Sequence, residues 1–314
     1  MAMKRRSMLV LVAAGLLFVT ASDVWSQERQ RNRNRNRAPR IAPTHADAKY
    51  GPHERNVLDF WQAPSEEPTP VLISIHGGGF RGGNKQVVGF PLQRLLDEGI
   101  SVAAITYRLS DDAIAPAQFD DAARAVQFVR SKAGEWNIDP DRFAACGGSA
   151  GAGLSLWLAF HDDLADPQSD DPLKKQSTRL KTAVVFNGQS SYDPRFLRDL
   201  FPESDTYRHS ALAELFGIDM DQLDDLPEEK YRLFEEVSSI THLSKDDPPV
   251  MLVYNRPADV AVTNQGIGIH HAKLGLVLKK KMDALGIECV VTAAGEPADA
   301  PEPLEFLKKR LIGE

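Results

Sequence analysis

The sequence predicts an α/β fold in which helices flank a mostly parallel central sheet. From Tyr50 onward, short apolar segments alternate with segments of helical periodicity, which is the pattern of strands joined by crossover helices. Two of the apolar segments end abruptly in glycine-rich loops, as buried strands do at the edge of a sheet. The 314 residues, of which 42% are hydrophobic, are enough to bury one large core.

Residues 1–26 have the pattern of a cleaved secretory signal peptide. Lys4, Arg5 and Arg6 precede an apolar run from Met8 to about Ala21, which is short for a membrane span. No cysteine precedes Cys146, so a bacterial-type lipid anchor on this segment is not expected. We therefore expect export, to the periplasm or the extracellular space, with no stable membrane anchor.

Residues 27–45 indicate a disordered linker rich in Arg and Asn, because they have no apolar face to bury. The alternative is binding to RNA or an anionic polysaccharide, but no aromatic residues are interleaved with the arginines. Residues 1–40 hold nine basic and two acidic residues, so the rest of the chain carries 28 basic and 42 acidic residues, a net charge of −14. The predicted domain, residues 46–314, is therefore a poor candidate for binding nucleic acid.

Within this domain the apolar and helical patterns follow one another in order. The expected strands lie near residues 56–61, 71–75, 101–106, 142–146, 181–187, 249–254 and 287–292. The expected helices lie near residues 84–98, 117–135, 150–160, 269–285 and 302–312. Residues 161–180 are polar and indicate a surface excursion, and residues 194–240 indicate a helical insertion, either a lid or ordinary surface packing. Cys146 and Cys289 lie in separate expected strands, so we expect unpaired apolar fillers, and no cluster of metal ligands is expected.

Two glycine-rich loops carry the candidate site. The strand at 142–146 runs into Gly147-Gly148-Ser149-Ala150-Gly151, a strand, sharp turn and helix that would expose Ser149 as a nucleophile. The helix expected from Ala150 would direct its positive N-terminal end at a substrate. The strand at 71–75 runs into His76-Gly77-Gly78-Gly79, whose backbone can approach a ligand closely and present N–H groups to an oxyanion. The serine loop alone is more often a plain glycine-rich turn before a helix, but the two loops together favour acyl transfer.

These loops resemble those of the α/β-hydrolase superfamily, in its esterase and lipase branch, and within it the BD-FAE-like group of feruloyl and carbohydrate esterases. The resemblance covers residues 50–311 and includes Leu58-Asp59, Tyr107-Arg108-Leu109-Ser110, Asp121-Ala122-Ala123-Arg124-Ala125 and Asp246-Asp247-Pro248-Pro249-Val250. It implies an oxyanion hole formed by Gly78, Gly79 and Ala150, and structural roles for His76, Gly77, Gly147 and Gly151. It also implies hydrolysis of a small-molecule or carbohydrate ester, with no cofactor and no metal.

An activated serine requires a base, and the base requires a group that orients it. The resemblance places the orienting acid at Asp259, a few residues after the strand at 249–254; Glu296 and Asp299 are weaker candidates. It places the histidine after the last strand, but no histidine follows His271. One hypothesis is therefore a relocated base, His270 or His271, at the start of the helix at 269–285. The other is a catalytically impaired binding protein that has lost the base.

The remaining side chains near the site carry weaker expectations. His76 as the base is a third hypothesis, which its expected structural role disfavours. Asn187, Gln189 and Tyr192 follow a strand end and are expected to line the pocket. The other histidines are expected to be surface or packing residues: His45, His53, His161, His209 and His242.

Overall fold

A computed structural model describes residues 41–295 and 300–313 of the chain. Residues from Ala42 onward form one compact unit. Its first strand, β1 (His45–Lys49), includes the last residue of the predicted linker, because His45 pairs with Phe60 and stacks on Trp136. The predicted domain start at residue 46 therefore moves back to Ala42. The predicted signal peptide and residues 27–40 of the predicted linker lie outside the described residues.

Across the described residues, eight strands form one sheet in the order β1-β2-β4-β3-β5-β6-β7-β8. β1 and β2 run antiparallel to their neighbours, whereas the strands from β4 to β8 are parallel. The bounds of the other strands are β2 Val57–Trp61, β3 Thr69–Ile75, β4 Ser101–Ile105, β5 Ile138–Gly148, β6 Thr182–Phe186, β7 Val250–Tyr254 and β8 Cys289–Ala293. Every residue of β3 is buried, as expected for a parallel strand covered on both faces. All seven predicted strands and the mostly parallel sheet are confirmed.

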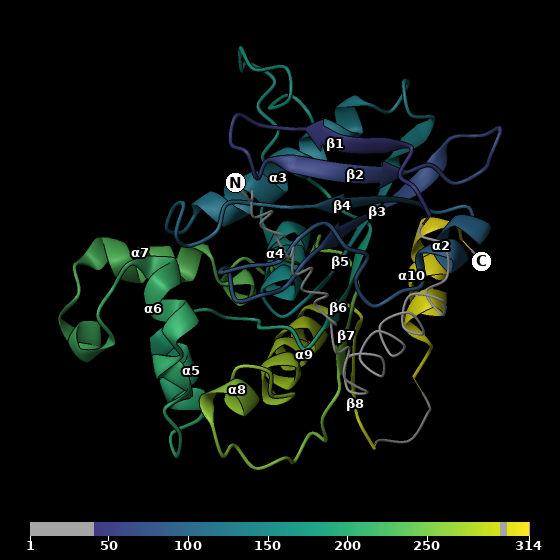
Figure 1. Cartoon of the computed structure of the whole chain (residues 1–314). Helices are drawn as coiled ribbons and strands as arrows, with labels where there is room; N and C mark the ends of the chain where they lie inside the picture. The colour runs from purple at the N-terminus through teal and green to yellow at the C-terminus, as the bar shows by residue number, and fades with distance from the viewer. Residues whose placement is uncertain (1–40, 296–299, 314) are drawn as a thin grey trace, which may run out of the picture. The chain divides into compact units, whose positions relative to one another are not determined.

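Helices cover both faces of this sheet. α3 (Ala117–Ser131), α4 (Ala150–Phe160) and α9 (Lys273–Leu285) lie on one face, and α2 (Leu92–Asp97) and α10 (Pro303–Leu311) lie on the other (Figure 1). An ion pair of 2.8 Å between Lys308 and Glu98 joins α10 to the end of α2. One continuous hydrophobic core fills the space between the sheet and the face covered by α3, α4 and α9. Because the strands from β4 to β8 are parallel, their carboxyl ends lie at one edge of the sheet.

Two predicted helices begin later than expected. The segment expected to be helical over residues 84–98 is helical only from Leu92, because Gly89 has a φ of +77° and Pro91 disfavours helical geometry in the residue before it. The helix expected over residues 269–285 begins only at Lys273, as α9, and a short helix, α8 (Gln265–Gly268), precedes it. His270 and His271 therefore lie in the turn between the two helices and do not open a helix.

The predicted helical insertion is confirmed. Between β6 and β7, short helices follow one another, and Figure 1 shows α5, α6 and α7 gathered on one side of the sheet. They are α5 Pro194–Leu200, η1 Thr206–Arg208, α6 Ser210–Phe216, η2 Met220–Asp225, α7 Glu228–Glu236 and η3 Ser239–Thr241.

Two further properties of the described residues bear on the expectations. Cys146 and Cys289 are buried and unpaired, which confirms their expected role as fillers. No helix in the described part of the chain has the length and apolar character needed to cross a membrane.

Candidate active site

Ser149 lies at the sharp turn between β5 and α4. Its backbone has a φ of 52° and a ψ of −122°, a strained conformation for a residue with a side chain. The turn is tight on both sides of the serine: a Cβ at Gly147 would lie 2.2 Å from the Gly151 carbonyl oxygen, and a Cβ at Gly151 would lie 2.1 Å from that of Ile75. Only glycine fits at these two positions, so the strand and the helix can meet closely and leave the serine side chain exposed to the pocket.

His270 contacts the serine hydroxyl. Its Nε2 lies 2.8 Å from Ser149 Oγ, and its Nδ1 lies 2.9 Å from the carbonyl oxygen of Gly266. Because a carbonyl oxygen only accepts hydrogen bonds, Nδ1 carries the proton, and the lone pair of a neutral ring on Nε2 faces the serine. Burial lowers the pKa of His270, and the nearby positive charge of Arg256 lowers it further, against the opposing effect of the Gly266 hydrogen bond. The ring is therefore neutral at neutral pH, which is the state that can accept the serine proton.

His271 has a different environment, although it is the next residue. It is buried, and its Nε2 donates to the Val260 carbonyl oxygen at 2.9 Å while its Nδ1 accepts from the Lys273 N–H at 3.0 Å. Its ring also packs edge-on against Phe201. Both ring nitrogens are occupied by the backbone, so His271 is not available as a base for Ser149.

Asp259 is exposed and lines a separate hollow together with His271. Among the described hydrogen bonds, the partner of His270 Nδ1 is the Gly266 carbonyl oxygen and not a carboxylate. The expectation that Asp259 orients the histidine is therefore replaced: a backbone carbonyl within the same turn occupies that position. The weaker candidates Glu296 and Asp299 lie outside the described residues.

The predicted oxyanion-hole residues meet at the same pocket. Gly78, Gly79 and Ala150 line it together with Ser149 and His270. Within the part of the chain that the structure describes, no hydrogen bond engages the N–H groups of Gly78, Gly79 or Ala150. Ala150 is the first residue of α4, where a helix leaves its N–H groups without intrahelical partners. Three backbone donors therefore remain available to a ligand in this pocket.

His76 braces the glycine loop. The ring is fully buried and stacks on Tyr107 at a centroid distance of 4.3 Å. Its Nδ1–H donates to the Gly77 carbonyl oxygen at 2.7 Å, and its Nε2 accepts from the Arg55 guanidinium at 3.3 Å. Burial lowers its pKa to about 4. Because both ring nitrogens are engaged and the ring is neutral, His76 has a structural role and is not a base for Ser149.

The pocket itself is a cavity of about 250 Å³. The insertion forms one wall of it through His209, Ala211 and Leu212, and Arg81 contributes from the glycine loop. His209 was expected to be a surface or packing residue; its placement in the pocket corrects that expectation. An isolated histidine in a helical insertion carries no sequence signal for a pocket position.

The residues that follow β6 are also partly corrected. Gln189 and Tyr192 line the pocket as expected, but Asn187 does not and instead accepts the Asn255 N–H on its side-chain oxygen at 3.0 Å. Gln189 has a second function that the sequence did not reveal. Its side-chain amide donates to the Ile269 carbonyl oxygen at 2.7 Å and so fixes the residue just before His270.

The sequence matches the BD-FAE family model over residues 58–272. It is 31% identical to the probable carboxylic ester hydrolase LipM of Mycobacterium tuberculosis over 227 residues, which are 71% of this chain and 50% of LipM. It is 32% identical to esterase LipQ of the same organism over 154 residues, 48% of this chain and 36% of LipQ. The chain thus spans about half or less of the length of these curated relatives.

Solved structures of esterases share the fold. A carbohydrate esterase from gut microbiota superposes with a TM-score of 0.63 at 22% identity, covering 82% of this chain and 89% of that one. An acetyl ester-xyloside bifunctional hydrolase from Caldicellulosiruptor lactoaceticus superposes with a TM-score of 0.62 at 20% identity, covering 86% and 95%. At these identities the likeness shows the α/β-hydrolase fold, as the sequence predicted.

Proposed function

The chain belongs to the BD-FAE family of α/β-hydrolase esterases, and from this premise we propose that it is a carboxylic ester hydrolase whose nucleophile is Ser149. Ser149 Oγ attacks the ester carbonyl carbon while its proton passes to Nε2 of His270. The N–H groups of Gly78, Gly79 and Ala150 donate to the oxygen that becomes negative. The protonated His270 then gives its proton to the departing alcohol, and a water molecule activated in the same way releases the acid and regenerates Ser149.

The observation that carries this proposal is the 2.8 Å contact between Ser149 Oγ and His270 Nε2. That distance is within the range expected for a nucleophile and its general base. The hydrogen bond from Nδ1 to Gly266 supports the proposal, because it holds the ring in the tautomer that can accept a proton at Nε2. The relocated base thus has a physical basis, although the position after the last strand lacks a histidine.

One observation favours the alternative, a catalytically impaired binding protein that uses the same cleft. The oxygen that faces His270 Nδ1 is a neutral carbonyl, and Arg256 adds a repulsive positive charge. The carbonyl stabilises the imidazolium ion that forms when the serine is deprotonated less than a carboxylate would, and the charge of Arg256 destabilises it. We therefore propose an active esterase that is slower than one with a carboxylate behind its histidine.

The proposed substrate is a short acyl ester, with a carbohydrate as the alcohol component. A cavity of about 250 Å³ with apolar walls at Leu212 and Ile269 fits a small acyl group. The carbohydrate component is supported by the named activities of the two structural relatives, a carbohydrate esterase and an acetyl ester-xyloside hydrolase. Acetyl esters of polysaccharides are therefore the substrates to try first, and feruloyl esters, whose acyl group is much larger, test the size limit of the pocket.

Export is a further part of the proposal. It is supported by the basic residues Lys4, Arg5 and Arg6 and by the short apolar run that follows them. N-terminal sequencing of the protein recovered from the medium or periplasm of a secreting host tests it. Recovery of the protein with an intact N-terminus in the cytoplasm would contradict export.

Labelling with a fluorophosphonate, measured by intact mass, tests the nucleophile directly. We expect one adduct on the wild-type protein and none on Ser149→Ala, because only a serine with a working base reacts readily. Hydrolysis of p-nitrophenyl acetate and p-nitrophenyl octanoate then tests the acyl size, with faster turnover expected for the acetate. A folded wild-type protein that forms no adduct would refute the esterase and favour the binding protein.

A further inference from the structure

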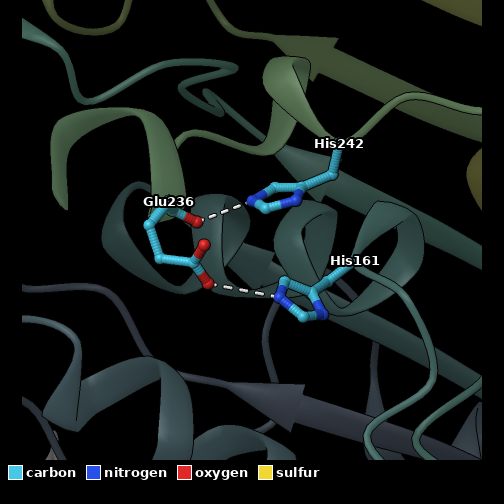
Figure 2. A group of neighbouring side chains, drawn as sticks. All are labelled: His161, Glu236 and His242. Atoms are coloured by element: carbon cyan, nitrogen blue, oxygen red, sulfur yellow. Dashed lines mark hydrogen bonds and ion pairs between the residues drawn. The ribbon is translucent and has the colours of Figure 1, made fainter. Parts of the chain in front are cut away.

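A second cluster of reactive side chains lies outside the catalytic pocket. It consists of His161, Glu236 and His242, which face one another in Figure 2. His161 follows the last residue of α4, Glu236 ends α7, and His242 follows η3. One candidate ligand atom from each of the three lies within 4.8 Å of the other two. The sequence predicted only surface or packing roles for these histidines, because the three residues are separated by up to 81 positions of chain.

One ring nitrogen of His161 contacts a backbone carbonyl oxygen, and the other contacts the carboxylate of Glu236. Its Nδ1 lies 2.8 Å from the carbonyl oxygen of Asp162, so Nδ1 carries the proton. Its Nε2 lies 3.2 Å from Oε1 of Glu236, as Figure 2 shows. In a neutral ring this nitrogen has a lone pair and no proton, so it faces an ionised carboxylate without a hydrogen bond. A cation between the two atoms, or a second proton on the ring, balances the contact.

The same geometry is that of a metal ligand pair. Two ligands in a tetrahedral Zn²⁺ site, each about 2.0–2.1 Å from the metal, lie about 3.4 Å apart. The 3.2 Å between His161 Nε2 and Glu236 Oε1 is close to that spacing. A histidine that binds a metal through one nitrogen usually donates its other N–H to a carbonyl or carboxylate. The hydrogen bond from His161 Nδ1 to Asp162 already provides this support.

His242 is placed to supply a third ligand. Its Nε2 lies 2.6 Å from the backbone carbonyl oxygen of Glu236, and its ring centroid is 4.6 Å from that of His161. To bind a metal, the His242 ring turns Nε2 away from the carbonyl and carries its proton on Nδ1 instead, so that the lone pair of Nε2 faces the metal. The carbonyl keeps a partner after this change, because the indole N–H of Trp157 also donates to it at 2.9 Å.

We propose that His161, Glu236 and His242 bind a divalent transition metal of the Zn²⁺ class, with water as the fourth ligand. Two imidazoles and one carboxylate suit Zn²⁺ rather than Mg²⁺ or Ca²⁺, which prefer oxygen ligands. Asp120 adds negative charge nearby, since its carboxyl interacts with that of Glu236. Glu236 is about half exposed, so a metal ion can reach the site from solvent.

The metal links the insertion to the helix that carries the nucleophile. α4 has Ser149 just before its first residue and His161 just after its last, about 18 Å apart along the helix axis. Glu236 and His242 belong to the end of the insertion, whose α6 forms a wall of the catalytic pocket. The metal therefore stabilises the insertion against α4, and it does not take part in ester hydrolysis.

Metal binding to the full chain, after removal of bound metal with a chelator, tests the proposal. We expect one equivalent of Co²⁺ to give the intense visible bands of a four-coordinate site with nitrogen and oxygen ligands, and Zn²⁺ to displace it. At a Zn²⁺ concentration one hundred times the Kd, the melting temperature should rise by about 5 °C. A wild-type protein without these bands would overturn the proposal, whatever the behaviour of the variants.

Three variants assign the site. Glu236→Gln and His161→Gln should each weaken Zn²⁺ binding at least tenfold and remove the thermal shift. His53→Gln is the matched control, because the Nε2 of His53 also lies near a carboxylate, 3.9 Å from Asp112, but among the described residues it belongs to no group of three potential metal ligands. Equal binding in Glu236→Gln and His53→Gln would overturn the assignment. So would binding that is kept in Glu236→Gln but lost in His270→Ala, since the metal would then lie at the catalytic pocket.

Discussion

The reduction of kcat in His270→Ala measures the rate enhancement from a serine and histidine pair in which a carbonyl oxygen takes the place of the usual carboxylate. In a full triad, loss of the histidine lowers kcat by a factor of about 2 × 10⁶ and loss of the acid by about 3 × 10⁴. A serine and histidine pair without the acid is therefore about 70 times faster than an enzyme without the histidine. Here the Gly266 carbonyl also holds the correct tautomer, which is part of what the acid supplies. We therefore expect His270→Ala to reduce kcat by a factor between about 10² and 10⁴.

The assay is steady-state hydrolysis of p-nitrophenyl acetate, with Ser149→Ala as the background. His271→Gln is the matched control, because its amide can still donate to the Val260 carbonyl oxygen that His271 contacts. It should keep kcat within about threefold of the wild type. Added imidazole should partly restore His270→Ala, since the deleted ring leaves space beside Ser149 for a small base.

Two results would refute this reasoning. If His270→Ala keeps a third or more of the wild-type rate while Ser149→Ala is inactive, the base for the serine is another group. If His271→Gln loses as much activity as His270→Ala in folded protein, and imidazole restores neither variant, the turn between α8 and α9 acts only as a support. The contact of 2.8 Å between Ser149 and His270 would then have no catalytic meaning.

Three further predictions follow from burial and close contacts. Esterase activity needs a neutral His270, so kcat/KM should fall as the pH drops through the pKa of His270. Arg256→Gln removes a positive charge that lowers this pKa, and it should therefore move the acid limb of the kcat/KM profile to higher pH. An acid limb at the wild-type pH would contradict this prediction. Gly151→Ala places a Cβ 2.1 Å from a carbonyl oxygen and should lower the free energy of unfolding, measured by urea denaturation, by about 2 kcal/mol or more. Gly134→Ala is the control, because its Cβ meets nothing within 4 Å and the free energy of unfolding should not fall. The pKa of His76 is about 4 when folded and is ordinary when unfolded, so the unfolded chain binds the extra proton. The contribution of His76 to the free energy of unfolding should therefore fall by about 3 kcal/mol in total as the pH drops from about 6.5 to 4. An NMR titration of the folded protein that gives an ordinary pKa for His76 would contradict this prediction.

The parts of the molecule that could be predicted are those whose cause is local in the sequence. The buried strands appear as apolar runs. At the Ser149 turn, Gly147 is required for a local reason, because a Cβ there meets the carbonyl oxygen of Gly151 in the same turn. Gly151 belongs to the same sequence motif, although the carbonyl oxygen that excludes its Cβ is that of Ile75 in β3. β1 was missed, because it is a short edge strand with an exposed polar sequence and so lacks an apolar pattern.

The position of the base is a long-range property and could be predicted only as a pair of alternatives. His270 meets Ser149 across 121 positions of chain, and the choice between His270 and His271 depends on which ring the turn between α8 and α9 directs inward. The partner of His270 could not be predicted at all. Every residue has a backbone carbonyl, so nothing in the sequence distinguishes Gly266 from its neighbours, whereas Asp259 was suggested by the order of residues in the family.

The relocated histidine makes the base depend on the insertion. In the resembled family the base follows the last strand, whereas here α8 leads into the turn that carries His270. The insertion fixes α8 from one side: a Cβ at Gly268 would meet Thr206 at 1.9 Å, and Gln265 donates to Asp205 at 3.1 Å. The Gln189 side chain holds Ile269 from the other side. Because the same insertion also forms a wall of the pocket, a change in its packing alters both the space for the acyl group and the distance from His270 to Ser149. Substrate preference and turnover rate are therefore expected to change together when the insertion is mutated.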